Sequence, residues 1–407
     1  MNETNVLGDR RILPRSVVVT LCLLLAAIAT PVAGGPPASA ATSGTQTIGD
    51  WPMFHSSLNR LGINRTERKI NVASAPTLNL KWSFATGGSI YSSPAVAGGV
   101  VYFGSDDKKV YAVAAVTGTK LWSYTTGDLV RSSPSVVGGV VYIGSDDNNV
   151  YALNALTGTK IWSFATGDDV ELSSPLIAGG KVYVGSLDGY VYALDRLTGA
   201  KIWSVNTWAA RGSFAISGST VYVGSDKSTL WALDANTGVT RWTAVVGGRI
   251  KNTPSIAKGV VYVGADDGRV YAFDAVTGDL KWQTAVLGGC AVVRSSPAIF
   301  NGRVYIVTGE TCPMDGNFYV FDASSGTQIC THHMADYATS SVAIARGVAL
   351  VGSYSHQLYA FDASTCDKLW ASSFSEMQGG VPSSPAVSRG VAYVGSLDDS
   401  LYSFTPG

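Results

Sequence analysis

A motif of about forty residues repeats along this chain of 407 residues and restricts its fold more than any other feature. Residues 151–167 read YALNALTGTKIWSFATG, and variants of this segment recur before and after it. The place of its tryptophan is occupied in turn by Trp82, Trp122, Trp162, Trp203, Trp242, Trp282, Cys330 and Trp370, at steps of 40, 40, 41, 39, 40, 48 and 40 residues. A fixed period near forty, with several strand-like segments in each unit, predicts a β-propeller.

Each repeat unit divides into four short strands joined by tight turns. In one unit, residues 132–137 predict the innermost strand, 140–144 the second, 150–153 the third and 160–164 the outermost. Glycine, aspartate and asparagine separate these segments, and those residues favour the turns of antiparallel sheets. Apolar and polar residues alternate with period two between the turns, so helices fit the pattern poorly.

The first and last strand-like segments predict how the ring closes. Innermost strands are expected to begin near Ser92, Ser132, Ser173, Gly212, Asn252, Ser295, Ser340 and Ser383. Residues 401–404 form a third strand without an outer partner, whereas the outer strand 80–84 precedes the first full unit. Pairing these two strands would close the ring and remove the exposed sheet edges. We therefore predict an all-β, eight-bladed propeller of four-stranded antiparallel blades at 79–407, with residues 51–78 packed on it.

The N-terminal residues predict export from the cytoplasm. Arg10, Arg11 and Arg15 precede the apolar run 17–29, and the small residues 38–40 suit a cleavage site. This pattern predicts a signal peptide at 1–40 and a flexible leader at 41–50. The paired Arg10 and Arg11 leave twin-arginine export open beside the general route. We expect an extracytoplasmic protein, periplasmic or secreted, with no membrane span after signal removal, and the formal net charge of zero predicts no general nucleic-acid binding.

One motif resembles a known family. Ala152, Asn154, Thr157, Gly158 and Trp162 fit the pattern A-x-D/N-x-x-T-G-x-x-x-W. It resembles the tryptophan-docking motif of PQQ-type, quinoprotein-like propeller repeats, a family that includes quinoprotein alcohol dehydrogenases and the non-enzymatic outer-membrane assembly factor BamB. In that family the motif's tryptophan packs on the glycine of the next motif. The resemblance therefore implies a structural docking role for Trp82, Trp122, Trp162, Trp203, Trp242, Trp282 and Trp370.

Four cysteines follow the predicted signal peptide, and an even number in an exported protein suggests disulfides. Cys330 occupies the tryptophan place of one motif and Cys366 the glycine place of the next. Since those places touch in the family, the resemblance implies a Cys330–Cys366 bond. Cys290 precedes an inner strand of the widened repeat, and Cys312 lies in the loop after the following strand. Both should therefore lie on one face, and we also expect a Cys290–Cys312 bond. A reactive or metal-bound thiol is the alternative, although no C-x-x-C spacing occurs.

A ligand would be expected at the mouth of the central channel. The residues before the eight innermost strands include Arg131, Arg211, Lys251 and Arg294. Converging cations would attract an anion, and Tyr91 and Trp208 could offer stacking surfaces. In the alternative interpretation these cations pair with Asp128, Asp168, Asp169, Glu171 and Asp336 as a solvated rim.

The remaining polar motifs predict neither a metal site nor a catalytic residue. His332 and His333 are adjacent in a strand and would point to opposite faces. The paired acids Asp106–Asp107, Asp146–Asp147, Asp266–Asp267 and Asp398–Asp399 recur where hairpin turns are expected, and turn chemistry accounts for them.

Three functions remain open at this point. The preferred one is a secreted, non-enzymatic and monomeric platform that binds a protein or an anionic envelope ligand without a cofactor. The second is an alcohol or sugar dehydrogenase that requires PQQ and calcium, as the resemblance implies for part of the family. The third is a propeller that binds carbohydrate or cell wall. The chain has no adjacent cysteine pair of the kind many family dehydrogenases carry, so we lean away from an enzyme.

Overall fold

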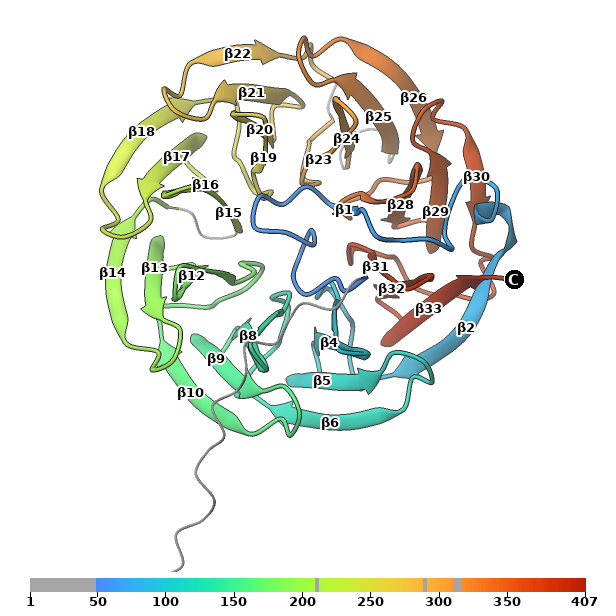
Figure 1. Ribbon diagram of the computed structural model, residues 1–407, viewed down its shortest axis with the longest axis horizontal. Coiled ribbons are helices and arrows are strands. Elements are labelled where there is room, and N and C mark those ends of the chain that lie inside the picture. The colour runs from blue at the N-terminus through green and yellow to red at the C-terminus, as the bar shows by residue number, and fades with distance from the viewer. Residues whose placement is uncertain (1–48, 209–211, 288–290, 310–315) are drawn as a thin grey trace, which may run out of the picture. The chain divides into compact units, whose positions relative to one another are not determined.

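The computed structural model describes residues 49–208, 212–287, 291–309 and 316–407, which belong to one compact unit, residues 42–407. These residues form eight sheets placed around a common centre (Figure 1). Each contains four antiparallel strands, and one of these sheets gains a fifth strand, β1 (Ile63–Asn64), which pairs in parallel. The predicted eight-bladed, all-β propeller is thereby confirmed. The predicted signal peptide at 1–40 lies outside the described residues.

Each blade begins with a short strand near the centre. From the innermost strand outwards, blades 1 to 4 consist of β3 (Ala95–Ala97), β4 (Val100–Ser105), β5 (Lys109–Ala114) and β6 (Lys120–Thr125); β7 (Ser135–Val137), β8 (Val140–Ser145), β9 (Asn149–Asn154) and β10 (Lys160–Ala165); β11 (Leu176–Ala178), β12 (Lys181–Gly185), β13 (Tyr190–Asp195) and β14 (Lys201–Asn206); β15 (Phe214–Ser217), β16 (Thr220–Gly224), β17 (Thr229–Asp234) and β18 (Thr240–Val245). Blades 5 to 8 consist of β19 (Ser255–Ala257), β20 (Val260–Gly264), β21 (Val270–Asp274) and β22 (Leu280–Gln283); β23 (Ala298–Phe300), β24 (Arg303–Val307), β25 (Gly316–Asp322) and β26 (Gln328–Met334); β27 (Ala343–Ala345), β28 (Val348–Ser353), β29 (Gln357–Asp362) and β30 (Lys368–Ala371); β31 (Ala386–Ser388), β32 (Val391–Gly395), β33 (Ser400–Pro406) and β2 (Leu78–Ala85).

The innermost strands are shorter than the sequence predicts. Strand β7 begins at Ser135 rather than at Ser132. The two preceding serines bond to the next blade instead of to their own sheet. Ser132 Oγ donates to the Ser173 carbonyl at 2.8 Å, and the Ser133 amide donates to Ser174 Oγ at 3.3 Å. Residues that we expected to extend the blade therefore tie neighbouring blades together around the channel.

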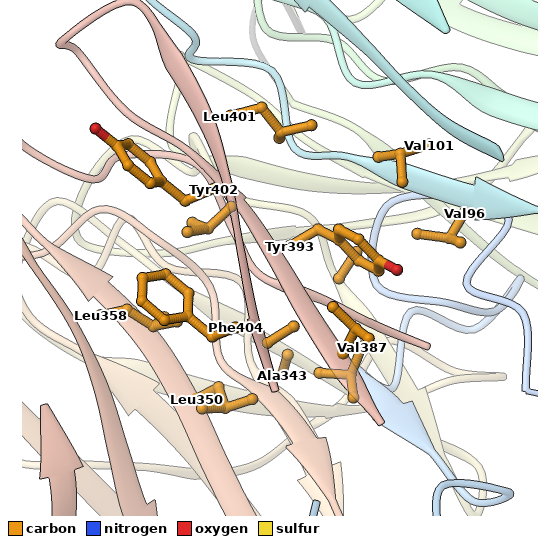
Figure 2. Close-up of a cluster of buried hydrophobic side chains, with 14 of the residues drawn as sticks. Val96, Val101, Ala343, Leu350, Leu358, Val387, Tyr393, Leu401, Tyr402 and Phe404 are labelled. Carbon is orange, nitrogen blue, oxygen red and sulfur yellow. The ribbon is translucent and has the colours of Figure 1, made fainter. Parts of the chain in front are cut away.

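The ring closes between the two ends of the propeller, as predicted. Strand β2 pairs antiparallel with β33, from Leu78 opposite Pro406 to Ala85 opposite Ser400. Each innermost strand contacts the innermost strands of the blades beside it, and β31 of blade 8 contacts β3 of blade 1. Figure 2 shows the buried apolar side chains near the closure, where Tyr393 and Phe404 of blade 8 lie close to side chains of blades 1 and 7. A continuous apolar core therefore crosses the closure.

The segment before the propeller crosses the centre of the ring (Figure 1). We call residues 51–64 the channel segment; it includes β1 (Ile63–Asn64), which pairs in parallel with β27. Main-chain groups of this segment bond to innermost-strand residues Val96, Val136, Ile216, Ile256, Ile299 and Ile344. Asn64 Nδ2 donates to Val387 of β31 at 2.8 Å, and Arg60 Nη2 to Pro175, which directly precedes β11, at 3.5 Å. The channel segment is therefore bonded to every blade. A short helix, η1 (Ala75–Thr77), precedes β2.

Six seams between blades share one tryptophan contact. Trp162 lies against Gly199 so closely that a Cβ there would stand 2.8 Å from Trp162 Cδ2. Trp162 Nε1 and the Tyr142 hydroxyl both donate to the Arg196 carbonyl of the next blade, at 3.1 and 3.2 Å. The equivalent pairs are Trp82–Gly118, Trp122–Gly158, Trp203–Gly238, Trp242–Gly278 and Trp282–Gly326. Trp370 packs differently, edge-on against Phe404 with ring centroids 5.4 Å apart.

The seam between blades 6 and 7 has a disulfide instead. Cys330 and Cys366 are bonded, with their Cα atoms 6.0 Å apart. Cys366 has a φ of +68°, close to the +74° of Gly199, so the cysteine adopts the left-handed conformation that glycine has in the other seams. The predicted Cys290–Cys312 bond lies outside the described residues.

Candidate functional site

A pocket with a volume of ≈ 250 Å³ lies where the chain approaches the innermost strands. Of the residues predicted from the sequence, Tyr91, Arg131, Lys251 and Arg294 line it. Trp208 is not among the described residues that line the pocket; its indole is half-exposed and lies 5.0 Å from Lys227 Nζ. Arg211 lies outside the described residues. The structure therefore brings three of the four predicted cations and one of the two aromatic residues to one pocket.

The cations of the pocket are held by carboxylates that the sequence analysis assigned to turn chemistry. Arg131 donates from Nε and Nη2 to the two oxygens of Asp106, both at 3.0 Å. Lys251 Nζ and Arg294 Nε both contact Asp266, at 3.1 and 3.4 Å. Of the acids predicted for the rim, Glu171 lies 3.9 Å from Arg131. These ion pairs fix the direction in which the cations face the pocket.

Asp146 occupies in blade 2 the position that Asp106 has in blade 1, but its surroundings differ. Asp106 of blade 1 pairs with Arg131 of blade 2. At the place equivalent to Arg131, blade 3 has Leu172, so no arginine is offered to Asp146 there. One Asp146 oxygen is buried with no hydrogen-bond partner among the described residues. Burial raises the pKa of Asp146 to about 7; Arg131 opposes this shift, and nearby acids such as Asp169 add to it. Asp146 is therefore a carboxyl group that titrates near neutral pH.

A ring of hydroxyl groups lines the pocket, one from each blade. This hydroxyl ring consists of Ser93, Ser133, Ser174, Ser213, Thr253, Ser296, Ser341 and Ser384, all of them buried. Seven of the oxygens accept a main-chain N–H from the blade before, at 2.8 to 3.3 Å, and Thr253 Oγ1 is the exception. A hydroxyl that accepts such a bond keeps its hydrogen for another acceptor. Sequence analysis missed this ring, although its signal was the second residue of the repeated Ser-Ser-Pro.

The channel segment lies deeper along the axis than the hydroxyl ring. In blade 1, the pocket residue Tyr91 is followed by the ring residue Ser93, and Val96 bonds to Trp51 of the channel segment. Phe54 of the segment reaches the pocket and forms part of its lining. The pocket is therefore closed on the inner side by the protein's own chain.

Two polar side chains of the channel segment are fully enclosed. Arg60 is 0% exposed and donates to the carbonyls of Phe54, Phe214 and Pro175. Desolvation lowers the pKa of Arg60 to about 9, so the guanidinium is still protonated at neutral pH. Burial also lowers the pKa of His55 to about 4, which leaves this imidazole neutral beside the Arg60 carbonyl.

The repeats of this chain match the model of one known family over residues 66–406. The model for the outer membrane protein assembly factor BamB matches residues 66–213, 187–329 and 314–406. The chain belongs to this family. A search of curated proteins found no match. The sequence resemblance to PQQ-type repeats is confirmed by the BamB family match and by the solved structures that follow.

Solved structures with this fold include BamB and dehydrogenases. BamB from Moraxella catarrhalis is 20% identical, with 81% of this chain and 99% of that chain covered and a TM-score of 0.68. Quinohemoprotein alcohol dehydrogenase from Comamonas testosteroni is 17% identical, with 89% and 81% covered and a TM-score of 0.74. A europium-containing methanol dehydrogenase is also 17% identical, with 88% and 98% covered and a TM-score of 0.73. At these identities the likeness shows the fold alone.

The pocket fits one part of the cofactor that the dehydrogenase resemblance implies. Arg131, Lys251, Arg294 and the hydroxyl ring supply donors for the carboxylates of PQQ, and no acidic side chain of the described residues lines the pocket. Calcium requires several oxygen ligands. Within the described ranges, no group of three or more His, Cys, Asp or Glu side chains is arranged to hold a metal ion. The lining therefore matches an organic anion, and no calcium ligands can be assigned.

Proposed function

We propose that this protein is an exported binding platform without catalytic activity, which holds a protein or an anionic envelope ligand at the pocket of its central channel. The observation that supports this best is the chemistry of the lining. Its charged side chains are all cations, and each of these is oriented by a carboxylate outside the lining. Such fixed donors favour selective binding of acidic groups, because little reorganisation is needed when the ligand arrives.

Two findings support an extracytoplasmic location. The Cys330–Cys366 disulfide is of a kind that persists in oxidising compartments. The description of the matching family is "outer membrane protein assembly factor BamB". Over the described part of the chain, helices with the length and apolar character of a membrane span are absent. We expect the platform to act as a monomer, which size-exclusion chromatography with light scattering would check.

The experiment is capture of a partner from envelope extracts by the purified, tagged protein. The test variant combines Arg131→Gln with Arg294→Gln, which removes two positive charges and retains polar side chains beside Asp106 and Asp266. We expect at least a tenfold loss of affinity for the captured partner. Arg241→Gln is the matched control, because Arg241 forms an exposed ion pair with Asp234 on the outer strand of blade 4. Equal capture by all three proteins would exclude the pocket as the binding site.

A quinone-dependent dehydrogenase is the second candidate, favoured by the two dehydrogenase structures and by the donors in the pocket. Titration with PQQ and calcium, followed by dye reduction with alcohols and sugars, tests it. The platform predicts no alcohol-dependent dye reduction at saturating cofactor. Turnover that Arg131→Gln abolishes would instead establish the dehydrogenase.

A further inference from the structure

We propose that the pocket binds a small oxyanion, a carboxylate or phosphate group, which enters along the channel axis and accepts hydrogen bonds from the hydroxyl ring. This inference rests on the proposed function, because it names the chemical group through which a ligand of the platform would be recognised.

The hydroxyl ring provides the donors. Each residue of the hydroxyl ring is at least nine-tenths buried, and no hydrogen bond donated by any of the eight hydroxyls is found among the described residues. For seven of them, the amide of the neighbouring blade already occupies a lone pair of the oxygen, at 2.8 Å from Ser174 to Ser213 for example. Their hydroxyl hydrogens are therefore the groups left to interact within the pocket. Buried donors without an acceptor are costly, and an oxyanion would satisfy several at once.

Among the described residues, the charged side chains that line the pocket have the sign that an oxyanion requires, while their carboxylate partners Asp106 and Asp266 lie outside the lining. Arg131, Lys251 and Arg294 line the pocket above the ring. Below it, Arg60 is fully buried, and its hydrogen bonds go to main-chain carbonyls alone within the described residues. Its guanidinium carbon lies 5.8 Å from the centre of the Phe54 ring, which itself contacts the pocket. A buried cation without a carboxylate favours a negative charge nearby, since electrostatic attraction is strong in a poorly solvated channel.

The size of the pocket limits what can carry the oxyanion. A volume of ≈ 250 Å³ is smaller than most sites for drug-sized ligands, which are roughly 300–1,000 Å³. It admits a small carboxylic acid, a phosphate group or one acidic side chain of a partner, and it does not admit a helix or a folded domain. The apolar Phe54, Leu172 and Pro382 in the lining leave room for a short carbon skeleton beside the charged group.

The first test is calorimetric titration of the mature protein at constant ionic strength. The probes are inorganic phosphate and tricarballylate, with glucose as a neutral comparator of similar size. We expect both anions to bind at one site and glucose not to bind. Thr253→Val should weaken anion binding about 2- to 10-fold, as the loss of one hydrogen bond predicts. This variant is suitable because Thr253 Oγ1, unlike the other ring oxygens, accepts no amide from a neighbouring blade among the described residues. Thr117→Val, at an exposed turn, is the control.

The second test introduces a carboxylate into the hydroxyl ring, in place of the oxyanion of a ligand. Thr253→Asp and Thr253→Asn have nearly the same shape and differ in charge, so the Asn variant controls for folding. The proposal predicts that Thr253→Asp melts at or above the temperature of Thr253→Asn at pH 7 and no longer binds phosphate. Binding of glucose but of neither anion, or anion binding that is equal in Thr253→Val and Thr253→Asp, would overturn the proposal. A Thr253→Asp variant less stable than Thr253→Asn would contradict it independently.

Competition separates this proposal from the platform on which it rests. If an envelope partner is captured and tricarballylate or phosphate displaces it, both hold. If the partner is captured and neither anion displaces it, the platform stands and the oxyanion site is wrong for that partner. If the anions bind and no partner is captured, the oxyanion site stands and the platform fails. The two probes also distinguish a carboxylate source from a phosphate source, because the better competitor identifies the group.

Discussion

Two seams of the propeller solve one packing problem by different means. Between blades 2 and 3, Trp162 lies on Gly199 and bonds to the Arg196 carbonyl. Between blades 6 and 7, Cys330 stands in the place of the tryptophan and is covalently joined to Cys366 in the place of the glycine. The first seam depends on apolar burial and one hydrogen bond. The second depends on a covalent bond, which acts mainly by restricting the unfolded chain.

The backbone conformation of the turn is the same in both seams, which explains why either pair can be accommodated. The turn residue is left-handed in each case, with φ of +74° at Gly199 and +68° at Cys366. Glycine takes this conformation without steric cost, whereas for a cysteine it costs roughly 1–2 kcal/mol. A strained non-glycine residue is retained in blade 7 because the disulfide replaces the ring contact that a side chain there excludes. Seven of the eight seams therefore follow the tryptophan–glycine pair or the cysteine pair, and we expect a mixture of the two pairs in one seam to be less stable than either.

Removal of a seam tryptophan should have the largest effect. Trp162→Ala deletes a side chain that is 8% exposed and leaves a cavity against Gly199. We expect a loss of about 3–5 kcal/mol in the free energy of unfolding, measured by denaturant titration. Trp370→Ala is the control, since Trp370 is only partly buried and packs on Phe404 instead of on a glycine. An equal loss for the two variants would show that the glycine contact adds nothing.

Loss of the disulfide should have a smaller effect. Cys330→Ser with Cys366→Ser opens a loop between cysteines 36 residues apart, and we expect the unfolding free energy to fall by about 2–4 kcal/mol. Reduction of the wild-type protein should lower its stability similarly, while the double variant should not respond to reductant.

A redesigned seam sharpens the same comparison. Cys330→Trp with Cys366→Gly restores the pair found in six other seams and should recover part of the stability that the double serine variant loses. Each single change should be worse than the pair. Cys330→Trp alone introduces a ring that the Cys366 side chain blocks, and Cys366→Gly alone leaves a glycine with no ring to cover it. Additive single and double effects in a double-mutant cycle would refute this coupling.

The smallest change in stability is expected for variants of Asp106 and Asp146, which occupy equivalent positions of blades 1 and 2 at the channel mouth. Asp106 has Arg131 as its partner, whereas the repeat supplies Leu172 at the equivalent place for Asp146, whose pKa is raised from 3.8 to about 7. Folded protein holds this proton at a pH where the unfolded chain has lost it, so the group's contribution to stability falls as pH rises from about 4 to about 7. Asp146→Asn should stabilise the protein at pH 8 and not at pH 4. The gain should stay below about 1 kcal/mol, because the carboxyl group is only partly buried.

The matched variant for this last prediction is Asp106→Asn, which removes a paired carboxylate. It should destabilise the protein at pH 8, since Arg131 loses its bidentate partner. The two variants are compared by urea unfolding at both pH values. Destabilisation by Asp146→Asn at pH 8 would mean that its carboxylate has a stabilising partner in solution.

The fold could be predicted from the sequence because every level of the pattern agrees. The number of repeats, each about forty residues long, predicts the number of blades. The two strands without partners, near residues 80–84 and 401–404, predict the pairing that closes the ring. The channel segment could not be predicted in detail. Its course from Trp51 to Asn64 has no periodicity, and its bonds to six of the blades use main-chain groups that any sequence supplies.

The site could be predicted only in part, for a physical reason. Position along the repeat determines which residues reach the mouth, and so Arg131, Lys251 and Arg294 were found. Pairing depends on side-chain reach across a seam, so Asp106 and Asp266 were assigned to turns alone. Serine in a Ser-Ser-Pro, which five of the eight repeats carry, looks like ordinary strand chemistry. Only the closed ring shows that one hydroxyl from each blade lines the same pocket.

The closure has a consequence for the time at which the protein matures. Strands β2 and β33 join residues 321 positions apart, as the bond from the Trp82 amide to Ser403 Oγ shows. Contacts this distant in sequence form slowly, because a long loop must be ordered before they contribute. Residues 51–64, which are synthesised early, find all their partners only after blade 8 exists. The channel segment can therefore complete its hydrogen bonds only in the last step of folding, after all eight blades have formed.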